Sequence, residues 1–345
     1  MSVIIQEEIF GEFEGETVLK YLIKEKDGIS VGIINYGAAI TNIFVPDKNG
    51  LLVDVVLGFT GLDGYVRAKD IYMGSICGRY ANRISGGEFT LADEVYSLQK
   101  NNEENTLHGG VNGFDKKFWK SGILKSKDGI IFTCTSKNQE EGFPGNLIIE
   151  VTYRILNKAL HIEYTAKTDK PTPINLTSHC YFNLSGGNDK NIFYHELMLN
   201  ADHYLEVNKS FIPTGKILET KNSSYDFKAF KLIGNLSLHP LNFDHSWVVN
   251  KAENELDTVA VIRHARTGIQ MNVSSTEPSI HFYTGNFLNK DLILTKQRDG
   301  YDKYAGLCLE AQHYPDSPNQ PTFPNTILKP GEEYSQKTIY AFTSN

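Results

Sequence analysis

Two stretches of this sequence each place one titratable side chain among apolar or neutral residues. Glu310 follows Leu307-Cys308-Leu309, and His179 lies between small polar residues and aromatic ones. A carboxylate among apolar residues is costly to bury unless it has a partner or a use. A glutamate and a histidine that meet form a base and an acid, and both can work near neutral pH. The two stretches therefore predict a general acid–base site.

Two arginines lie four residues apart in the segment 77–84. The simpler interpretation is a surface loop with solvated charges. However, Arg83 stands between Asn82 and Ile84 in a stretch of small and apolar residues, which favours a hydrogen bond inside the protein. The guanidinium is a rigid fork of donors that suits hydroxyl and carboxylate oxygens. Arg83 is therefore a candidate binding residue, although the motif alone does not establish a site.

Three further segments combine histidine or aspartate with glycine or aromatic residues. His108 precedes two glycines, which permit close backbone approach, but alone it is more typical of a structural loop histidine. Asp244 precedes His245 and Trp247, and a carboxylate near an aromatic ring suits sugar hydroxyls and C–H faces. His281 begins a run of aromatic residues, which fits a core strand with a bulge equally well.

Several kinds of chemistry have no motif here. The sequence contains no HExxH, no Cys/His ligand cluster, no P-loop, no GxGxxG and no GxSxG, and its ten histidines are scattered. We therefore expect an acid–base enzyme that uses no metal and no cofactor. The net charge of −7, without any basic block, argues against a nucleic-acid partner.

Strand signals dominate the chain. Residues 41–45 and 53–59 flank a turn signal at 46–50 and predict a hairpin, and 147–156 and 160–166 predict a second one. Within 161–167 the even positions are apolar and the odd ones polar, which is the period of a half-buried strand. Only 61–65 and 222–230 look less like strands, so these segments predict short helices or loops.

The pattern as a whole predicts an all-β protein that spans 1–345 as a single domain with few short helices. We expect one large antiparallel β-sandwich, although the pattern alone does not distinguish a sandwich from a closed barrel. The four cysteines show no framework spacing, which is typical of reduced, buried thiols. The N-terminus has no signal-peptide pattern, and no apolar run approaches the roughly 18 residues that span a membrane. We therefore expect a cytoplasmic protein without membrane contact.

Taken together, the motifs resemble the aldose 1-epimerase (galactose mutarotase) family over nearly the whole chain. Each motif is weak alone, but their number and order are highly specific. In order, they are 34–38 (INYGA), 55–59 (VVLGF), 78–84 (GRYANRI), 107–110 (LHGG), 142–145 (GFPG), 175–184 (NLTSHCYFNL), 283–287 (YTGNF), 309–312 (LEAQ) and 315–319 (PDSPN).

This resemblance implies a large antiparallel sandwich (the galactose mutarotase-like supersandwich) with an open cleft for a free aldohexose such as galactose or glucose. It implies that Glu310 is the general base, His179 the general acid and His108 a second catalytic histidine. It further implies that Arg83 and Asp244, with Asn82 beside the arginine, bind sugar hydroxyls. The family also suggests a role in galactose or lactose catabolism, and the residues do not distinguish galactose, glucose, xylose and arabinose.

The sequence departs from the family pattern in two places. His281 stands where many relatives carry glutamine; as a substrate-binding residue it can still donate to a hydroxyl, but with a different bonding pattern. Ser178 and Cys180 flank the expected acid where the family often has asparagine and serine.

Three alternatives stay open. A hexose-6-phosphate 1-epimerase would need a cationic cluster for the phosphate. A non-catalytic sugar-binding homologue should lack Glu310 or His179. A glycosidase would use Glu310 and Asp244 as paired carboxylates. The residues predict no oligomeric state.

Overall fold

The computed structural model describes residues 3–68, 70–234, 242–297 and 299–345. Within these ranges the chain forms 27 strands and a single α-helix, α1 (Leu62–Arg67). The other helical elements of these ranges are four 3₁₀ turns, Ser85–Gly87, Phe114–Lys116, Glu140–Gly142 and Ser317–Asn319. The expected all-β fold with few short helices is confirmed.

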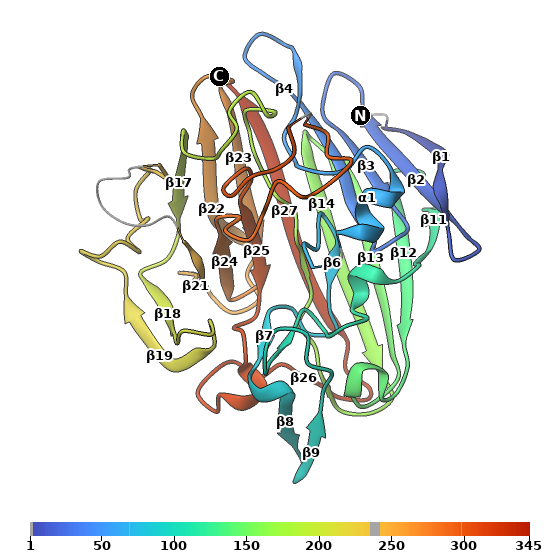
Figure 1. Cartoon of the computed structure of the whole chain (residues 1–345), viewed down its shortest axis with the longest axis vertical. Helices are drawn as coiled ribbons and strands as arrows, with labels where there is room; N and C mark the ends of the chain where they lie inside the picture. Colours follow the sequence, from blue (N-terminus) through green and yellow to red (C-terminus); the bar gives the residue numbers. More distant parts are fainter. Residues whose placement is uncertain (1–2, 69, 235–241, 298) are drawn as a thin grey trace.

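The largest layer is a nine-stranded antiparallel sheet whose centre is the C-terminal strand (Figure 1). Its order is β11 (Lys120–Ile123), β12 (Gly129–Ser136), β13 (Leu147–Leu156), β14 (Ala159–Thr168), β27 (Tyr334–Ser344), β23 (Ile269–Ser275), β22 (Asp257–His264), β17 (His195–Leu199) and β20 (Lys231–Leu232).

Two five-stranded sheets pack on this layer. The N-terminal one has the order β1 (Val3–Phe13), β2 (Glu16–Glu25), β3 (Ser30–Ile34), β4 (Ile40–Pro46) and β5 (Leu52–Asp54). The other, here called the site sheet, has the order β19 (Pro213–Glu219), β18 (His203–Val207), β21 (Asp244–Val248), β24 (Ser279–Tyr283) and β25 (Cys308–Gln312).

Four short strand pairs complete the fold of the described residues. They are β6 (Ile76–Cys77) with β16 (Thr177–Ser178), β7 (Arg83–Ile84) with β10 (Thr106–Leu107), β8 (Glu88–Leu91) with β9 (Glu94–Ser97), and β15 (Thr172–Pro173) with β26 (Ile327–Leu328).

One hydrophobic core joins all three large sheets. Buried side chains from the N-terminal sheet and from the site sheet meet those of the nine-stranded sheet in one continuous cluster, which includes Ile33, Tyr153, Tyr164, Trp247 and Leu309. Since both smaller sheets cover the same large sheet, the arrangement is a sandwich, as expected. The inner face of the site sheet is therefore used for packing, and its outer face is left for polar side chains.

The predicted hairpins are present with altered ends. The second pair forms β13 and β14, and burial alternates over 161–167 as the polar/apolar pattern predicts. The first pair forms β4 and β5, but β5 ends at Asp54 rather than at residue 59. The Asp54 carboxylate explains the early end, because it binds Asn42, Lys296 and the Ile43 amide across the loop. The segments 61–65 and 222–230 hold α1 and turns, respectively.

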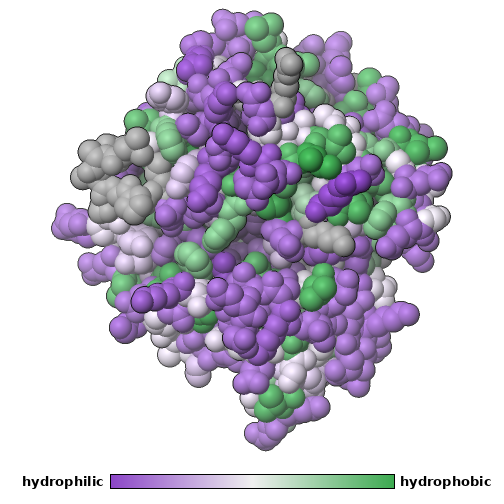
Figure 2. Space-filling model, in the orientation of Figure 1, coloured by the Kyte–Doolittle hydropathy of each residue, from purple (hydrophilic) through white to green (hydrophobic). Residues whose placement is uncertain are grey.

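The surface is predominantly polar. On the face shown in Figure 2, hydrophilic residues predominate and hydrophobic ones form small, separate patches. Among the described residues, none of the helices has both the length and the apolar character needed to cross a membrane.

Candidate active site

The outer face of the site sheet supplies three of the predicted site residues. Side chains alternate between the two faces of a strand, so Ile280 and Leu309 enter the core while His281 and Glu310 face outward. His281 lies opposite Glu310 in the pairing of β24 with β25. Asp244 begins β21 on the same outer face.

Loops from the first half of the chain bring the other predicted residues to this face. His179 directly follows β16, and its backbone bonds to Gly74 and Ser75. Asn82 precedes β7, and Arg83 is its first residue. The backbone N–H of His108 donates to the Asn82 carbonyl. The arrangement relies on left-handed backbone at Asn82 (φ 65°) and His108 (φ 51°), which is strained for residues with a Cβ.

Gly109 shows why a glycine must follow His108. Its φ is +91°, and a Cβ at this position would lie 2.0 Å from the Gly78 carbonyl oxygen. Only glycine permits this approach. The glycine pair noted in the sequence therefore serves to press the His108 loop onto the 78–84 segment.

All seven predicted site residues line one open cleft. The predicted residues are Asn82, Arg83, His108, His179, Asp244, His281 and Glu310. The lining also includes residues that sequence reasoning did not select, namely Asp70, Ile71, Tyr72, Leu107, Tyr181, Tyr283 and Phe287.

Glu310 and His179 face each other at the bottom of the cleft. Their closest atoms, Oε1 and Nε2, are 3.8 Å apart, and Glu310 is 1% exposed. Among the described residues, Glu310 Oε2 has no hydrogen-bond partner. Burial raises the pKa of Glu310 well above its usual value, and burial lowers the pKa of His179 to about 4. Both shifts favour the uncharged forms, a protonated carboxyl group and a neutral imidazole. In this state the pair holds one proton that it can transfer.

His108 is held as a neutral hydrogen-bond donor. The Asn82 amide donates to its Nδ1 (3.2 Å), so that nitrogen carries no proton and the proton resides on Nε2. Burial, followed by the neighbouring His179, lowers the pKa of His108 well below its usual value. The ring therefore offers one fixed N–H and does not titrate near neutral pH.

Arg83 and His281 hold the Asp244 carboxylate between them. Arg83 Nη2 lies 3.2 Å from one Asp244 oxygen, and His281 Nε2 lies 2.7 Å from the other. Burial raises the pKa of Asp244, but Arg83 and His281 together overcome this and hold it well below the usual value. His281 Nδ1 also contacts the Ser246 hydroxyl at 2.9 Å. Both ring nitrogens of His281 therefore have protein partners, and the side chain also lines the cleft.

A metal ion does not fit the cleft. His108, His179 and Glu310 offer ligand atoms that all lie within 4.8 Å of one another. However, a metal-binding histidine donates its other N–H to an acceptor, whereas His108 Nδ1 faces the N–H of Asn82. A metal at His108 Nε2 would move the ring proton to Nδ1, where it would face the N–H proton of Asn82. These side chains are therefore arranged for hydrogen bonding rather than for metal binding.

Tyr72 is the clearest residue that sequence reasoning missed. Its ring centroid lies 4.5 Å from that of His108 and 5.7 Å from that of His179, and Tyr181 packs against His179 at 5.0 Å. The Tyr72 side chain is buried and its φ is 55°. No motif marks Tyr72, whereas Tyr181 and Tyr283 stand inside motifs selected for their histidines.

Arg79, the other arginine of the 78–84 motif, is structural. It is 1% exposed and donates to the Pro144 and Gly145 carbonyls and to the hydroxyls of Ser136 and Thr172. It does not line the cleft. Arg79 therefore stabilises the fold, whereas Arg83 lines the cleft.

Comparisons with known proteins agree with this geometry. The family model for aldose 1-epimerase matches residues 20–341. The galactose mutarotase of Mus musculus is 42% identical over 99% of both chains, and the aldose 1-epimerase of Escherichia coli K12 is 32% identical over 95% of this chain and 96% of its own. The structure of the GalM/aldose epimerase homologue from C. elegans superposes with a TM-score of 0.85 at 29% identity, over 92% of this chain and 97% of its own. The chain therefore belongs to the aldose 1-epimerase family.

Proposed function

We propose that this protein interconverts the α and β anomers of a free aldohexose, with Glu310 as general base and His179 as general acid. The observation that carries the proposal is the buried pair at the cleft bottom. There, Glu310 Oε1 lies 3.8 Å from His179 Nε2, and Oε2 of the same carboxyl group has no partner among the described residues. Such perturbed, incompletely bonded groups are typical of catalytic sites.

The reaction needs one proton removed and one supplied. Glu310 takes the proton from the C1 hydroxyl while His179 gives one to the ring oxygen; the C1–O5 bond breaks and an aldehyde forms. Rotation about C1–C2 and the reverse transfers close the other anomer. The pair holds the single proton this requires: when that proton lies on His179, Glu310 is a carboxylate that can accept the C1 proton, and a C1 hydroxyl that donates to Glu310 stabilises this form. Each positioned group contributes roughly 10²–10⁴ in rate.

The remaining residues have binding roles in this proposal. The Nε2–H of His108 donates to the oxygen atoms around the anomeric centre, and Arg83, Asn82 and Asp244 bind hydroxyls further along the ring. Tyr72 and Tyr181 exclude water from the imidazole of His179. No step requires a cofactor, because the reaction transfers only protons.

The charges of the cleft disfavour a phosphorylated sugar. No lysine lines it among the described residues, and its one guanidinium there, Arg83, is already paired with Asp244. Asp70 at the rim adds a further carboxylate. A hexose 6-phosphate would thus meet three carboxyl groups and a neutralised arginine.

The paired state of Asp244 also disfavours the glycosidase hypothesis, and the presence of both Glu310 and His179 disfavours a binding-only homologue.

The cell compartment and the domain organisation belong to the same proposal. Free, buried thiols at all four cysteines are typical of a reducing compartment and support the cytoplasm. The continuous core shared by the three sheets supports one domain over 1–345.

Polarimetry tests the proposed function. Fresh α-D-galactose or α-D-glucose should relax to its unchanged final rotation faster with the protein, and Glu310→Gln should abolish this acceleration. If neither sugar relaxes faster while glucose 6-phosphate does, the free-aldose proposal is wrong.

A further inference from the structure

One buried side chain next to the site lacks a hydrogen-bond partner among the described residues. Gln312 is 0% exposed, and neither its amide nitrogen nor its amide oxygen makes a hydrogen bond in this part of the chain. An unpaired buried polar group costs about 1–3 kcal/mol, and Gln312 has two. Buried polar atoms of this kind are normally satisfied by ordered water.

The register of β25 places Gln312 beside Glu310. Residues two apart share a face, so Cys308, Glu310 and Gln312 lie in one row while Leu309 and Ala311 enter the core. The Cα atoms of residues two apart in a strand are about 6.6 Å apart, a separation that one water can bridge between the side-chain ends. The unpaired Oε2 of Glu310 is the third unsatisfied atom in this row.

Two hydroxyls near this row already donate to backbone carbonyls. The Ser279 hydroxyl, opposite Gln312 on β24, donates to the Gln312 backbone carbonyl at 2.7 Å. The Thr177 hydroxyl donates to the Ala311 carbonyl. Neither hydroxyl proton is therefore available to the Gln312 amide oxygen.

We propose that Gln312 is a positioning residue that donates to a buried water, which in turn donates to Glu310 Oε2 and favours the carboxylate form of the general base. The inference rests on the proposed function for its catalytic meaning. The bridge gives Glu310 a polar support on its buried side, opposite the side open to sugar. Loss of this water bridge makes the Glu310 carboxylate harder to form.

The pH dependence of kcat/KM tests this role. Gln312→Met keeps the length of the side chain but removes both polar atoms. Without the bridging donor, Glu310 should lose its proton only at higher pH. The acid limb of kcat/KM should therefore move up by about one pH unit, with about a tenfold loss at pH values on that limb. Charged and titratable groups that also surround Glu310 are Arg83, His108, His179, Asp244, His281 and the thiol of Cys308.

Gln336→Met is the matched control. Gln336 is also buried, but its amide donates to the Leu176 and Ala311 carbonyls. Both variants should lower the melting temperature, and only Gln312→Met should move the acid limb. If both variants lower stability and neither moves the limb, Gln312 is merely structural and the inference is wrong.

Two measurements without sugar separate this inference from the proposed function. In ¹³C-glutamate-labelled protein, the infrared carboxyl band that Glu310→Gln removes should titrate at higher pH in Gln312→Met. In the unaltered protein, the Gln312 side-chain amide should show a nuclear Overhauser contact with a long-lived water; its absence overturns the inference even if Gln312→Met does not fold. A wild type without epimerase activity but with both signals would overturn the proposed function alone.

Discussion

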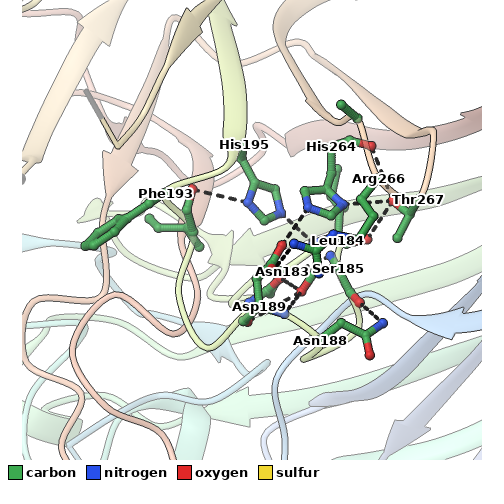
Figure 3. A network of polar contacts seen from close by, with 12 residues as sticks. Asn183, Leu184, Ser185, Asn188, Asp189, Phe193, His195, His264, Arg266 and Thr267 are labelled. Carbon is green, nitrogen blue, oxygen red and sulfur yellow. Dashed lines mark hydrogen bonds and ion pairs between the residues drawn. The ribbon is translucent and has the colours of Figure 1, made fainter. Parts of the chain in front are cut away.

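Two of the clusters in which this protein buries histidine with carboxylate are built differently. At the β17–β22 end of the large sheet, Asp189 accepts from His264 at 2.8 Å and from Arg266 at 2.9 Å (Figure 3). In the cleft, His179 and Glu310 stay 3.8 Å apart, and one carboxylate oxygen has no partner among the described residues. The first pair is bonded within the protein, whereas the second is left for a ligand.

His195 and His108 extend this contrast. His195 Nε2 accepts the Leu184 amide at 2.8 Å and its Nδ1 lies 3.2 Å from the Ile192 carbonyl, so both ends of the ring are used by backbone. His108 has a backbone partner at Nδ1 and presents its other nitrogen to the cleft. The comparison teaches that the number of unmet hydrogen bonds, more than burial or proximity, separates a reactive histidine from a structural one.

The largest expected effect comes from Glu310→Gln. The change removes the base, so kcat/KM should fall roughly 10²–10⁴-fold. It also removes a buried carboxyl group without a full set of partners, so the melting temperature should stay the same or rise. Polarimetry and calorimetry check the two parts. Near-wild-type turnover would contradict the mechanism, and a large loss of stability would contradict the contrast with Asp189.

Asp189→Ala should lower stability and leave turnover unchanged, which is the opposite of the effect expected for Glu310→Gln. It leaves His264 and Arg266 without their shared acceptor, and breaking a buried pair costs about 3–5 kcal/mol of unfolding free energy. Turnover per folded molecule should not change. The matched control is Asp299→Ala, which breaks the exposed ion pair with Lys190 and should have little effect on stability, because solvent screens such pairs. Denaturant unfolding measures both, and equal losses would contradict the prediction.

The two arginines of one motif sharpen the comparison further. Arg83→Ala should raise KM and also lower kcat, because the lost hydrogen bonds orient sugar in both ground and transition states. A charged hydrogen bond is worth about 1.5–3 kcal/mol, so kcat/KM should fall about tenfold to a hundredfold. Arg79→Ala should instead reduce stability and leave the KM of folded protein unchanged. Steady-state kinetics at several sugar concentrations distinguish the two.

A further expected effect is in the pH dependence of stability. Burial lowers the pKa of His195 from 6.5 to about 3. Between these values the unfolded chain binds a proton that the folded protein does not, so this contribution is full above pH 6.5 and is lost as the pH falls toward 3. His195→Gln should flatten the fall in melting temperature over this range, as calorimetry at a series of pH values would show.

Glu310 and His179 should partly cancel in that slope. The raised pKa of Glu310 and the lowered pKa of His179 act in opposite directions on the difference in bound protons between the folded and the unfolded state. Glu310→Gln should therefore make the melting temperature more sensitive to acid, and an unchanged slope would contradict this compensation.

The sequence was most informative where local pattern decides structure. The alternation over 161–167 predicted the strand and its buried face, because a period of two acts within a few residues. The same reasoning extended the strand over 53–59 too far, since β5 ends at Asp54. At that end the Asp54 carboxylate binds Lys296, 242 residues away in sequence, a contact that no local pattern reveals.

The site illustrates the same limit. Glu310 and His179 stood out by residue type, but no spacing shows that they meet, and the family resemblance supplied their assembly. Tyr72 could not be found, since its role depends on a left-handed turn that packs its ring against two histidines. His281 is still predicted to contact sugar, but no local pattern reveals that its ring also contacts Ser246 and Asp244 across strands.

The order of the site along the chain has a consequence for folding. The cleft combines residues from position 70 to position 310, and β25, which carries Glu310, lies at the edge of the site sheet. A chain still being synthesised at residue 300 has most of its binding residues and no base. Contacts so distant in sequence also form slowly. During refolding, turnover should therefore recover later than the spectroscopic signal of the strands. Its recovery reports when β25 joins the edge of the site sheet.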